Sequence, residues 1–98
     1  MTKEIKIKEI RFPTEEELTQ GITGTVQGLT RLTDTNKDYL VLSGDNCDYL
    51  LPHYQILNAY KRGLIKDGDK VRIVKIGTRK ISSTKSISVF EIFLIKED

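Results

Sequence analysis

One segment with helical spacing, set among segments with strand patterns, constrains the fold of this chain more than any other feature. In HYQILNAYKRGLI, residues 53–65, apolar side chains recur at intervals of three and four residues, which predicts an amphipathic helix. Gly63 lies at its expected C-terminal end, because glycine readily adopts the left-handed conformation that closes a helix. The place of this helix in the order of elements limits how the strands can be connected.

The segments around the helix are typical of β-strands. They are rich in β-branched and aromatic residues and are separated by the turn sequences TDTNKD, GDN and DG. We expect five strands, at residues 21–33, 39–44, 47–51, 69–81 and 86–96. A helix between the third and fourth of five strands is the connectivity of the five-stranded OB-fold barrel. Gly24 and Gly28 interrupt the first strand and predict a bulge or bend, which would let that strand serve both halves of a barrel.

The N-terminal part of the chain predicts two further elements. Residues 4–12 alternate between charged and apolar side chains, which favours an extra N-terminal strand that Pro13 ends. Thr14 and Glu17 have the spacing of a capping box, so TEEEL predicts a short helical turn closed by Gly21, with a mobile acidic loop as the alternative. We therefore expect one mainly β domain over residues 1–98, with its barrel core at about 21–96.

Composition limits the class of protein and its compartment. Among 98 residues, 38% are hydrophobic and 31% are charged, as in a soluble domain with a modest core. No apolar run approaches the roughly 20 residues of a membrane span, and no secretory signal opens the chain, so we expect a cytoplasmic protein (in the host cytoplasm if viral) without a membrane partner. Cys47 is the single cysteine and His53 the single histidine, too few for a zinc site built from such ligands, and we expect neither metal nor cofactor.

The charge of the chain is concentrated in one segment. Residues 61–85 hold nine basic and two acidic residues, a net charge of +7, whereas the rest of the chain carries −5. Within this segment GTRKISSTK, residues 77–85, belongs to a run with no acid between Asp69 and Glu91. A solvated hairpin tip is one interpretation, because lysine and arginine discourage strands from aggregating. The other is a binding surface for a polyanion, to which the hydroxyls of Ser82, Ser83 and Thr84 would contribute.

Two stretches, GLIKDGDKVRIVKIGTRK and SISVFEIFLI, carry a resemblance to a known family. They resemble the fourth and fifth barrel strands of small OB-fold, single-stranded-DNA-binding-like proteins of phages and mobile elements. The resemblance covers residues 21–96, and its specific part is 63–94. It implies a non-enzymatic protein of replication or recombination that binds single-stranded DNA, or RNA, with low sequence specificity. Its partners would also include a second copy or a replication protein. The chain departs from this family in its aromatic content, with no tryptophan and only 7% aromatic residues.

The resemblance also implies a location for the site. The groove of an OB-fold runs over strands two and three, between the loop that joins strands one and two and the loop that joins strands four and five. The candidate nucleic-acid-binding residues in these elements are Arg31, Lys37, Tyr39, Tyr49, Arg72, Lys75, Arg79, Lys80 and Lys85. The basic residues would neutralise phosphates, and the two tyrosines would stack on bases unless they pack in the core instead. Phe93 is a weaker candidate for stacking, and we expect Tyr54 and Tyr60 of the helix to lie in the core.

Other functions find less support in the sequence. Cys47 and His53 could form a nucleophile–base pair, but a strand and the helix that follows it bring such residues together by chance, so we expect no enzyme. No phosphate-binding GxxxxGK[ST] motif occurs. The main rival is a protein-interaction module that docks through KEIKIKEI as an edge strand, with the acids of TEEE as contacts. A third reading is a viral structural domain built on a small β-barrel. Spreading of the basic residues around the molecule would favour the rival over nucleic-acid binding.

Overall fold

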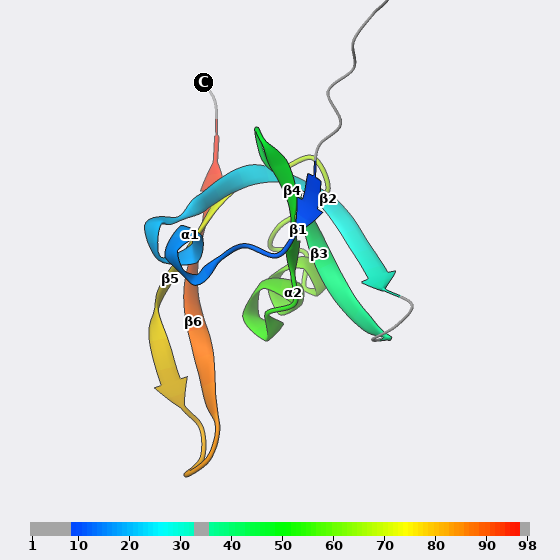
Figure 1. Cartoon of the computed structure of the whole chain (residues 1–98). Helices are drawn as coiled ribbons and strands as arrows, with labels where there is room; N and C mark the ends of the chain where they lie inside the picture. Colours follow the sequence, from blue (N-terminus) through cyan, green and yellow to red (C-terminus); the bar gives the residue numbers. More distant parts are fainter. Residues whose placement is uncertain (1–8, 33–35, 97–98) are drawn as a thin grey trace, which may run out of the picture.

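The computed structural model describes residues 9–32 and 36–96 and shows a mainly β protein (Figure 1). Its strands are β1 (Glu9–Arg11), β2 (Ile22–Leu32), β3 (Lys37–Ser43), β4 (Cys47–Leu51), β5 (Lys70–Lys80) and β6 (Ser86–Ile95). Its helices are α1 (Glu15–Gln20) and α2 (Tyr54–Lys61), and α2 lies between β4 and β5 in the chain. The predicted strands and helices are therefore present in the predicted order. Of the N-terminal strand expected at residues 4–12, residues 4–8 lie outside the described part.

The strands form one open sheet in the order β1-β4-β3-β2-β5-β6. All described strand pairs are antiparallel except β1 with β4, where Glu9 lies opposite Cys47 and Arg11 opposite Tyr49. The expected closure into a five-stranded barrel is not observed in this pairing. One reason is visible in the order of the strands, since β1 occupies the outer edge of β4 and leaves β6 as the opposite edge of the sheet.

The long strand β2 bends between its two neighbours, as its glycines predicted. It pairs with β5 over residues 22–25 and with β3 over residues 25–32. A Cβ atom at Gly24 would lie 2.6 Å from the backbone oxygen of Ser43, so only glycine permits this approach of β3. Gly28 has φ 103°, and the register shift between Val26 and Gly28 identifies a β-bulge.

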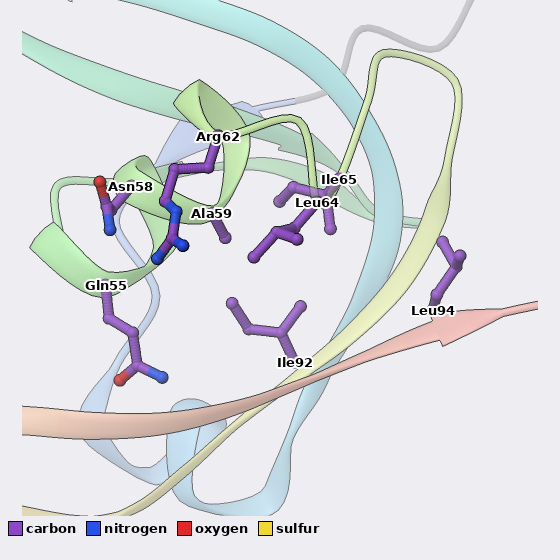
Figure 2. A pocket seen from close by; sticks show the side chains of 8 residues that line it. All are labelled: Gln55, Asn58, Ala59, Arg62, Leu64, Ile65, Ile92 and Leu94. Atoms are coloured by element: carbon purple, nitrogen blue, oxygen red, sulfur yellow. The ribbon is translucent and has the colours of Figure 1, made fainter.

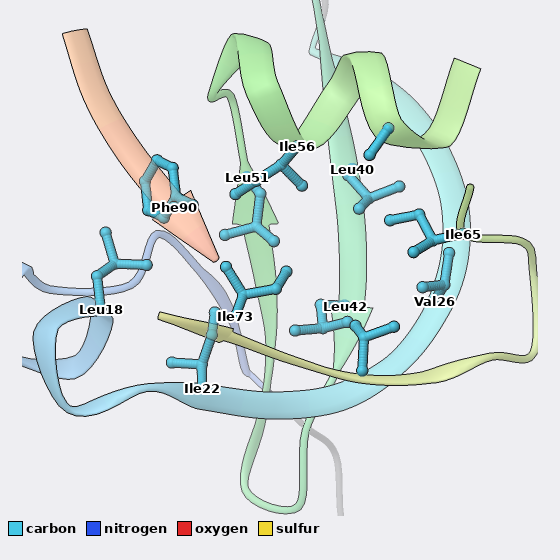
Figure 3. Packing of buried hydrophobic residues seen from close by; sticks show 12 residues of the cluster. Leu18, Ile22, Val26, Leu40, Leu42, Leu51, Ile56, Ile65, Ile73 and Phe90 are labelled. Atoms are coloured by element: carbon cyan, nitrogen blue, oxygen red, sulfur yellow. The ribbon is translucent and has the colours of Figure 1, made fainter. Parts of the chain in front are cut away.

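The hydrophobic core lies between α2 and the concave side of the bent sheet (Figure 3). Ile56 and Ala59 project from α2 into this cluster, and Leu18 reaches it from α1. The strands contribute fully buried branched side chains, among them Leu40, Leu42, Leu51, Val71 and Ile73. This packing fixes both helices against the sheet. Neither helix in the described ranges is long and apolar enough to cross a membrane.

The acidic segment after β1 is a helix with the predicted capping box, not a loop. The Oγ1 atom of Thr14 accepts a hydrogen bond from the backbone N–H of Glu17 at 3.1 Å. In return, Oε1 of Glu17 accepts one from the backbone N–H of Thr14 at 2.9 Å. Gly21 ends the helix by donating its N–H to the carbonyl of Glu17.

The hairpin formed by β5 and β6 projects beyond the rest of the sheet (Figure 1). Pairing between β2 and β5 ends at Ile73, and from there to Lys80 β5 pairs, among the described strands, with β6 alone. A register shift between Lys75 and Gly77 marks a bulge at the base of the projection. We call residues 76–88 the basic arm.

Candidate functional site

The basic arm presents three cations to solvent. Arg79 and Lys80 lie at the end of β5, and Lys85 lies in the turn; all three are exposed. None of them forms an ion pair with any residue of the described ranges. The arm also contains no acidic residue, so its charge is not neutralised internally.

Two of the three cations lie on different faces of the arm. In the β5–β6 ladder Arg79 lies opposite Ile87, and Lys80 lies opposite Ser86. Adjacent residues of a strand point to opposite faces, so Arg79 and Lys80 project from different faces of the ribbon. A polyanion that contacts both must therefore follow the edge of the ribbon or wrap around its tip.

A local hydrogen-bond network shapes the tip of the arm. The N–H of Ile81 donates to the carbonyl of Lys85 at 3.0 Å, which closes the turn. The Oγ atom of Ser82 accepts hydrogen bonds from the backbone N–H groups of Thr84 and Lys85, at 3.3 and 3.1 Å. The hydroxyl of Ser82 thus helps to hold the turn, and the side chains of Ser83 and Thr84 remain exposed.

The two predicted cations closer to the sheet have different surroundings. Lys75 forms an ion pair with Glu15 of α1, and its side chain is only 14% exposed. Its charge is therefore already neutralised within the chain. Arg72 remains exposed. Its guanidinium lies 5.9 Å from the ring centre of Phe93 and donates a hydrogen bond to the carbonyl of Gln20 at 3.4 Å.

Arg31 and Lys37 lie apart from the arm, on the β2–β3 hairpin. Figure 1 shows this hairpin and the arm as separate projections, with α2 between them. Nε of Arg31 lies 3.1 Å from Oδ1 of Asp38, whose other oxygen lies 3.8 Å from Nζ of Lys61. Lys37 is exposed. The predicted basic residues are thus brought together only at the arm.

Tyr39 packs in the protein. It is only 5% exposed, and Phe12 contacts it edge-on with 5.6 Å between the ring centres. Its ring therefore offers no open face on which a base could stack. Of the two alternatives that the sequence left open for Tyr39, packing in the core is the one observed.

Tyr49 belongs to a cluster with Arg11 and Glu17. The guanidinium of Arg11 lies 5.3 Å from the ring centre of Tyr49 and donates two hydrogen bonds of 2.7 Å to the carboxylate of Glu17. The hydroxyl of Tyr49 donates to Oε2 of Glu17 at 3.3 Å. The cluster follows from the register of β1 and β4, which places Arg11 opposite Tyr49. Sequence reasoning missed Arg11 because this contact depends on the pairing of distant segments.

Titration of the cluster reflects these contacts. The hydrogen bonds from Arg11, followed by the one from the backbone of Thr14, lower the pKa of Glu17 to about 2. The same carboxylate raises the pKa of Arg11 above its ordinary value. Burial is the main reason that the pKa of Tyr49 rises to about 12. Glu17 and Asp45 both line a polar hollow of about 320 Å³ beside Tyr49, which is a poor environment for phosphates.

Tyr54 is 79% exposed, so the expectation that it lies in the core is wrong. It is the first residue of α2, and its ring does not contact another aromatic ring of the described residues. An apolar groove of about 480 Å³ separates this end of α2 from the arm. The groove is lined by His53, Tyr54, Gln55, Ile81, Ile87 and Ser88. By contrast, Tyr60 packs against the core, and its hydroxyl donates to Oδ1 of Asp67 at 2.7 Å.

Gln55 joins α2 to β6 at the base of this groove. Its side-chain Nε2 donates to the carbonyl of Phe90 at 2.7 Å, and its Oε1 accepts from the N–H of Phe90 at 2.9 Å. The amide therefore pairs with the edge of β6 much as a neighbouring strand would. The ring of His53 packs at 4.6 Å from that of Phe90, and burial lowers the pKa of His53.

A second hollow, of about 390 Å³, lies between α2 and β6 (Figure 2). Ala59, Ile65 and Ile92 line its apolar part. The side chain of Arg62 extends from the end of α2 into the space that faces β6 (Figure 2). Leu64, 66% exposed, lies at the same hollow.

The described residues bring together no group of three or more His, Cys, Asp or Glu side chains that could hold a metal ion. Cys47 is buried in β4. Comparison with known proteins identified no matching family model, no similar curated protein and no similar solved structure.

Proposed function

We propose that this chain is a non-enzymatic protein that binds single-stranded nucleic acid, DNA in preference to RNA, through the basic arm. The observation that carries the proposal is the set of Arg79, Lys80 and Lys85, three exposed cations on a projecting hairpin without an acid. Phosphates are the natural partners of such a set, because each contact releases a condensed counterion.

Low sequence specificity is part of the proposal. Contacts from lysine and arginine to phosphates fix position on the strand but do not read its bases. Arg72 and Lys37 are exposed and remain secondary contacts, whereas Lys75 and Arg31 are engaged by Glu15 and Asp38. The contact surface is therefore narrower than the sequence predicted.

We further propose that the fold is a variant of the OB arrangement. The order of the strands, the position of α2 between β4 and β5, and the bent first strand β2 support this relation. The side chain of Gln55, which pairs with Phe90 on β6, would take the place of one strand contact that closes a barrel. Faster hydrogen exchange of the Phe90 amide in a Gln55→Leu variant would support this relation, and unchanged exchange would contradict it.

The binding proposal is tested by fluorescence anisotropy with a labelled oligo-dT of about 30 nucleotides, long enough for more than one site. Duplex DNA of the same length and oligo-U serve as comparisons. We expect binding to the single strand that weakens steeply between about 50 and 300 mM salt, with weaker binding to the duplex. Absence of binding at micromolar protein and low salt, or an affinity independent of salt, would contradict the proposal.

A protein-interaction module is the second candidate, and the hollow of Figure 2 favours it. The spread of the predicted basic residues over two hairpins, and over both faces of the arm, favours it as well. The hollow joins an apolar surface to the exposed Leu64 and to Arg62, a combination that suits a protein partner. The acids of TEEE, which the sequence suggested as contacts with that partner, are less available to it. Glu15 already pairs with Lys75, and Glu17 pairs with Arg11. A viral structural role would require self-association, which sedimentation of the purified chain measures directly.

A further inference from the structure

The apolar groove between α2 and the basic arm has one cation of the arm, Arg79, on the face that carries its wall. Ile87 on its wall lies opposite Arg79 in the ladder, so the two side chains share one face of the ribbon. Ile81, also on the wall, is bonded through its N–H to the carbonyl of Lys85. Tyr54 stands at the other wall with its ring exposed.

Three of the side chains that line this groove are large, apolar and exposed. Ile81 and Ile87 are 56% and 45% exposed, and Tyr54 is more exposed than either. Large apolar side chains gathered at one groove expose a surface that is stabilised when a ligand covers it. The ligand must also be compatible with the cations of the arm, which would repel a positively charged partner.

Single-stranded nucleic acid has both of the required properties. Its bases have apolar π-faces that stack on aromatic rings, and its backbone carries one negative charge at each nucleotide. In a duplex the same faces are stacked on one another and cannot reach a protein side chain unless they are unstacked. A groove with an aromatic wall beside a basic arm would therefore select single strands by their accessible bases.

We propose that this groove is a base-binding site in which the ring of Tyr54 is the stacking platform and Ile81 and Ile87 form the opposite wall. The inference rests on the proposed function and extends it, because it assigns preference for single strands to the groove and general affinity to the cations. Tyr54 thus takes the role that the sequence suggested for Tyr39 and Tyr49.

The test replaces Tyr54 by tryptophan. The chain has no natural tryptophan, so the emission of the Tyr54→Trp variant reports on this position alone. We expect oligo-dT and oligo-dA to quench that emission at saturation and duplex DNA to leave it nearly unchanged. Leu64→Trp is the matched control, an exposed apolar position at the hollow of Figure 2, and its emission should not respond to the oligonucleotide.

Affinity measurements complete the test. Tyr54→Ala should weaken binding to oligo-dT by about 5-fold or more, because stacking on one base is worth at least that factor. Tyr54→Phe should keep the wild-type affinity, since stacking uses the ring and not the hydroxyl. Leu64→Ala should also bind as wild type. All variants are checked for the wild-type unfolding transition, so that a loss of affinity cannot be assigned to unfolding.

The outcomes separate the inference from the proposed function. Salt-dependent binding of oligo-dT by the wild type, with unchanged Tyr54→Trp emission and full affinity of Tyr54→Ala, would overturn the groove and leave the arm as the binding surface. Failure of the wild type to bind any oligonucleotide would overturn both. Quenching of Tyr54→Trp by an acidic peptide with apolar residues, but not by oligonucleotides, would assign the groove to a protein partner and overturn the inference.

Discussion

Removing the charge of the basic arm should change how nucleic-acid affinity depends on salt. The perturbation is the triple substitution Arg79→Gln, Lys80→Gln and Lys85→Gln, which replaces three exposed cations without an ion pair in the described structure. Each phosphate contact on a single strand contributes about −0.7 to the slope of log K against log salt, so three contacts contribute about −2.

This slope converts into a measurable difference. Between about 50 and 300 mM salt a slope of −2 reduces affinity about 40-fold. The factor by which affinity falls over that interval should therefore be about 40 times smaller for the triple variant than for the wild type. The variant should nevertheless bind more weakly than the wild type at the lower salt concentration. Anisotropy titrations with oligo-dT at four or five salt concentrations give both slopes.

The matched control removes the same charge from exposed residues elsewhere. Arg62→Gln, Lys66→Gln and Lys96→Gln together lower the net charge by the same amount, and these residues lie outside the arm. We expect the slope of this control to stay at the wild-type value. Equal slopes for wild type and arm variant, or equal changes in both triple variants, would refute the assignment of phosphate contacts to the arm.

Three further predictions concern the scaffold. Gly24→Ala should destabilise the protein by about 2 kcal/mol in urea unfolding, because the new methyl would collide with the backbone of Ser43; wild-type stability would contradict the close approach. Gln55→Leu should lower the free energy of unfolding by about 2 kcal/mol, because it removes both hydrogen bonds to Phe90. The Phe90 amide should also exchange its hydrogen faster, and unchanged exchange would contradict these hydrogen bonds. Glu17→Gln should be less stable than the wild type above about pH 4.5, the ordinary pKa of a glutamate. The difference in stability should shrink as the pH falls towards about 2, where Glu17 of the wild type becomes protonated. A stability difference that does not depend on pH would contradict the lowered pKa.

The local elements of the fold could be predicted because their signals lie within a few residues. The capping box of Thr14 and Glu17 and the glycine at position 63 both act through neighbouring backbone groups. Gly28 likewise marked the bulge in β2. The exposure of the basic arm was also predictable, since an acid-free run within a hairpin finds no neutralising partner close by.

The candidate site was predicted only in part, because distant contacts decide which side chains remain accessible. Phe12 covers Tyr39, Arg11 covers Tyr49, and both come from the segment around β1. Lys75 is neutralised by α1, an element that the expected groove did not include. No pattern in the sequence predicts these pairings.

The order of strands and helices, the bend of β2 and the concentration of positive charge after α2 can all be predicted from the sequence, because propensity, capping, glycine geometry and charge are local properties. The pairing of β1 with the edge of β4, the open sheet, and the position of Tyr54 across an apolar groove from the arm follow from the packed fold and not from any local pattern. The physical reason is that edge pairing and burial are settled by competition among surfaces far apart in the chain, and the free energy of each contact depends on which partner is already in place.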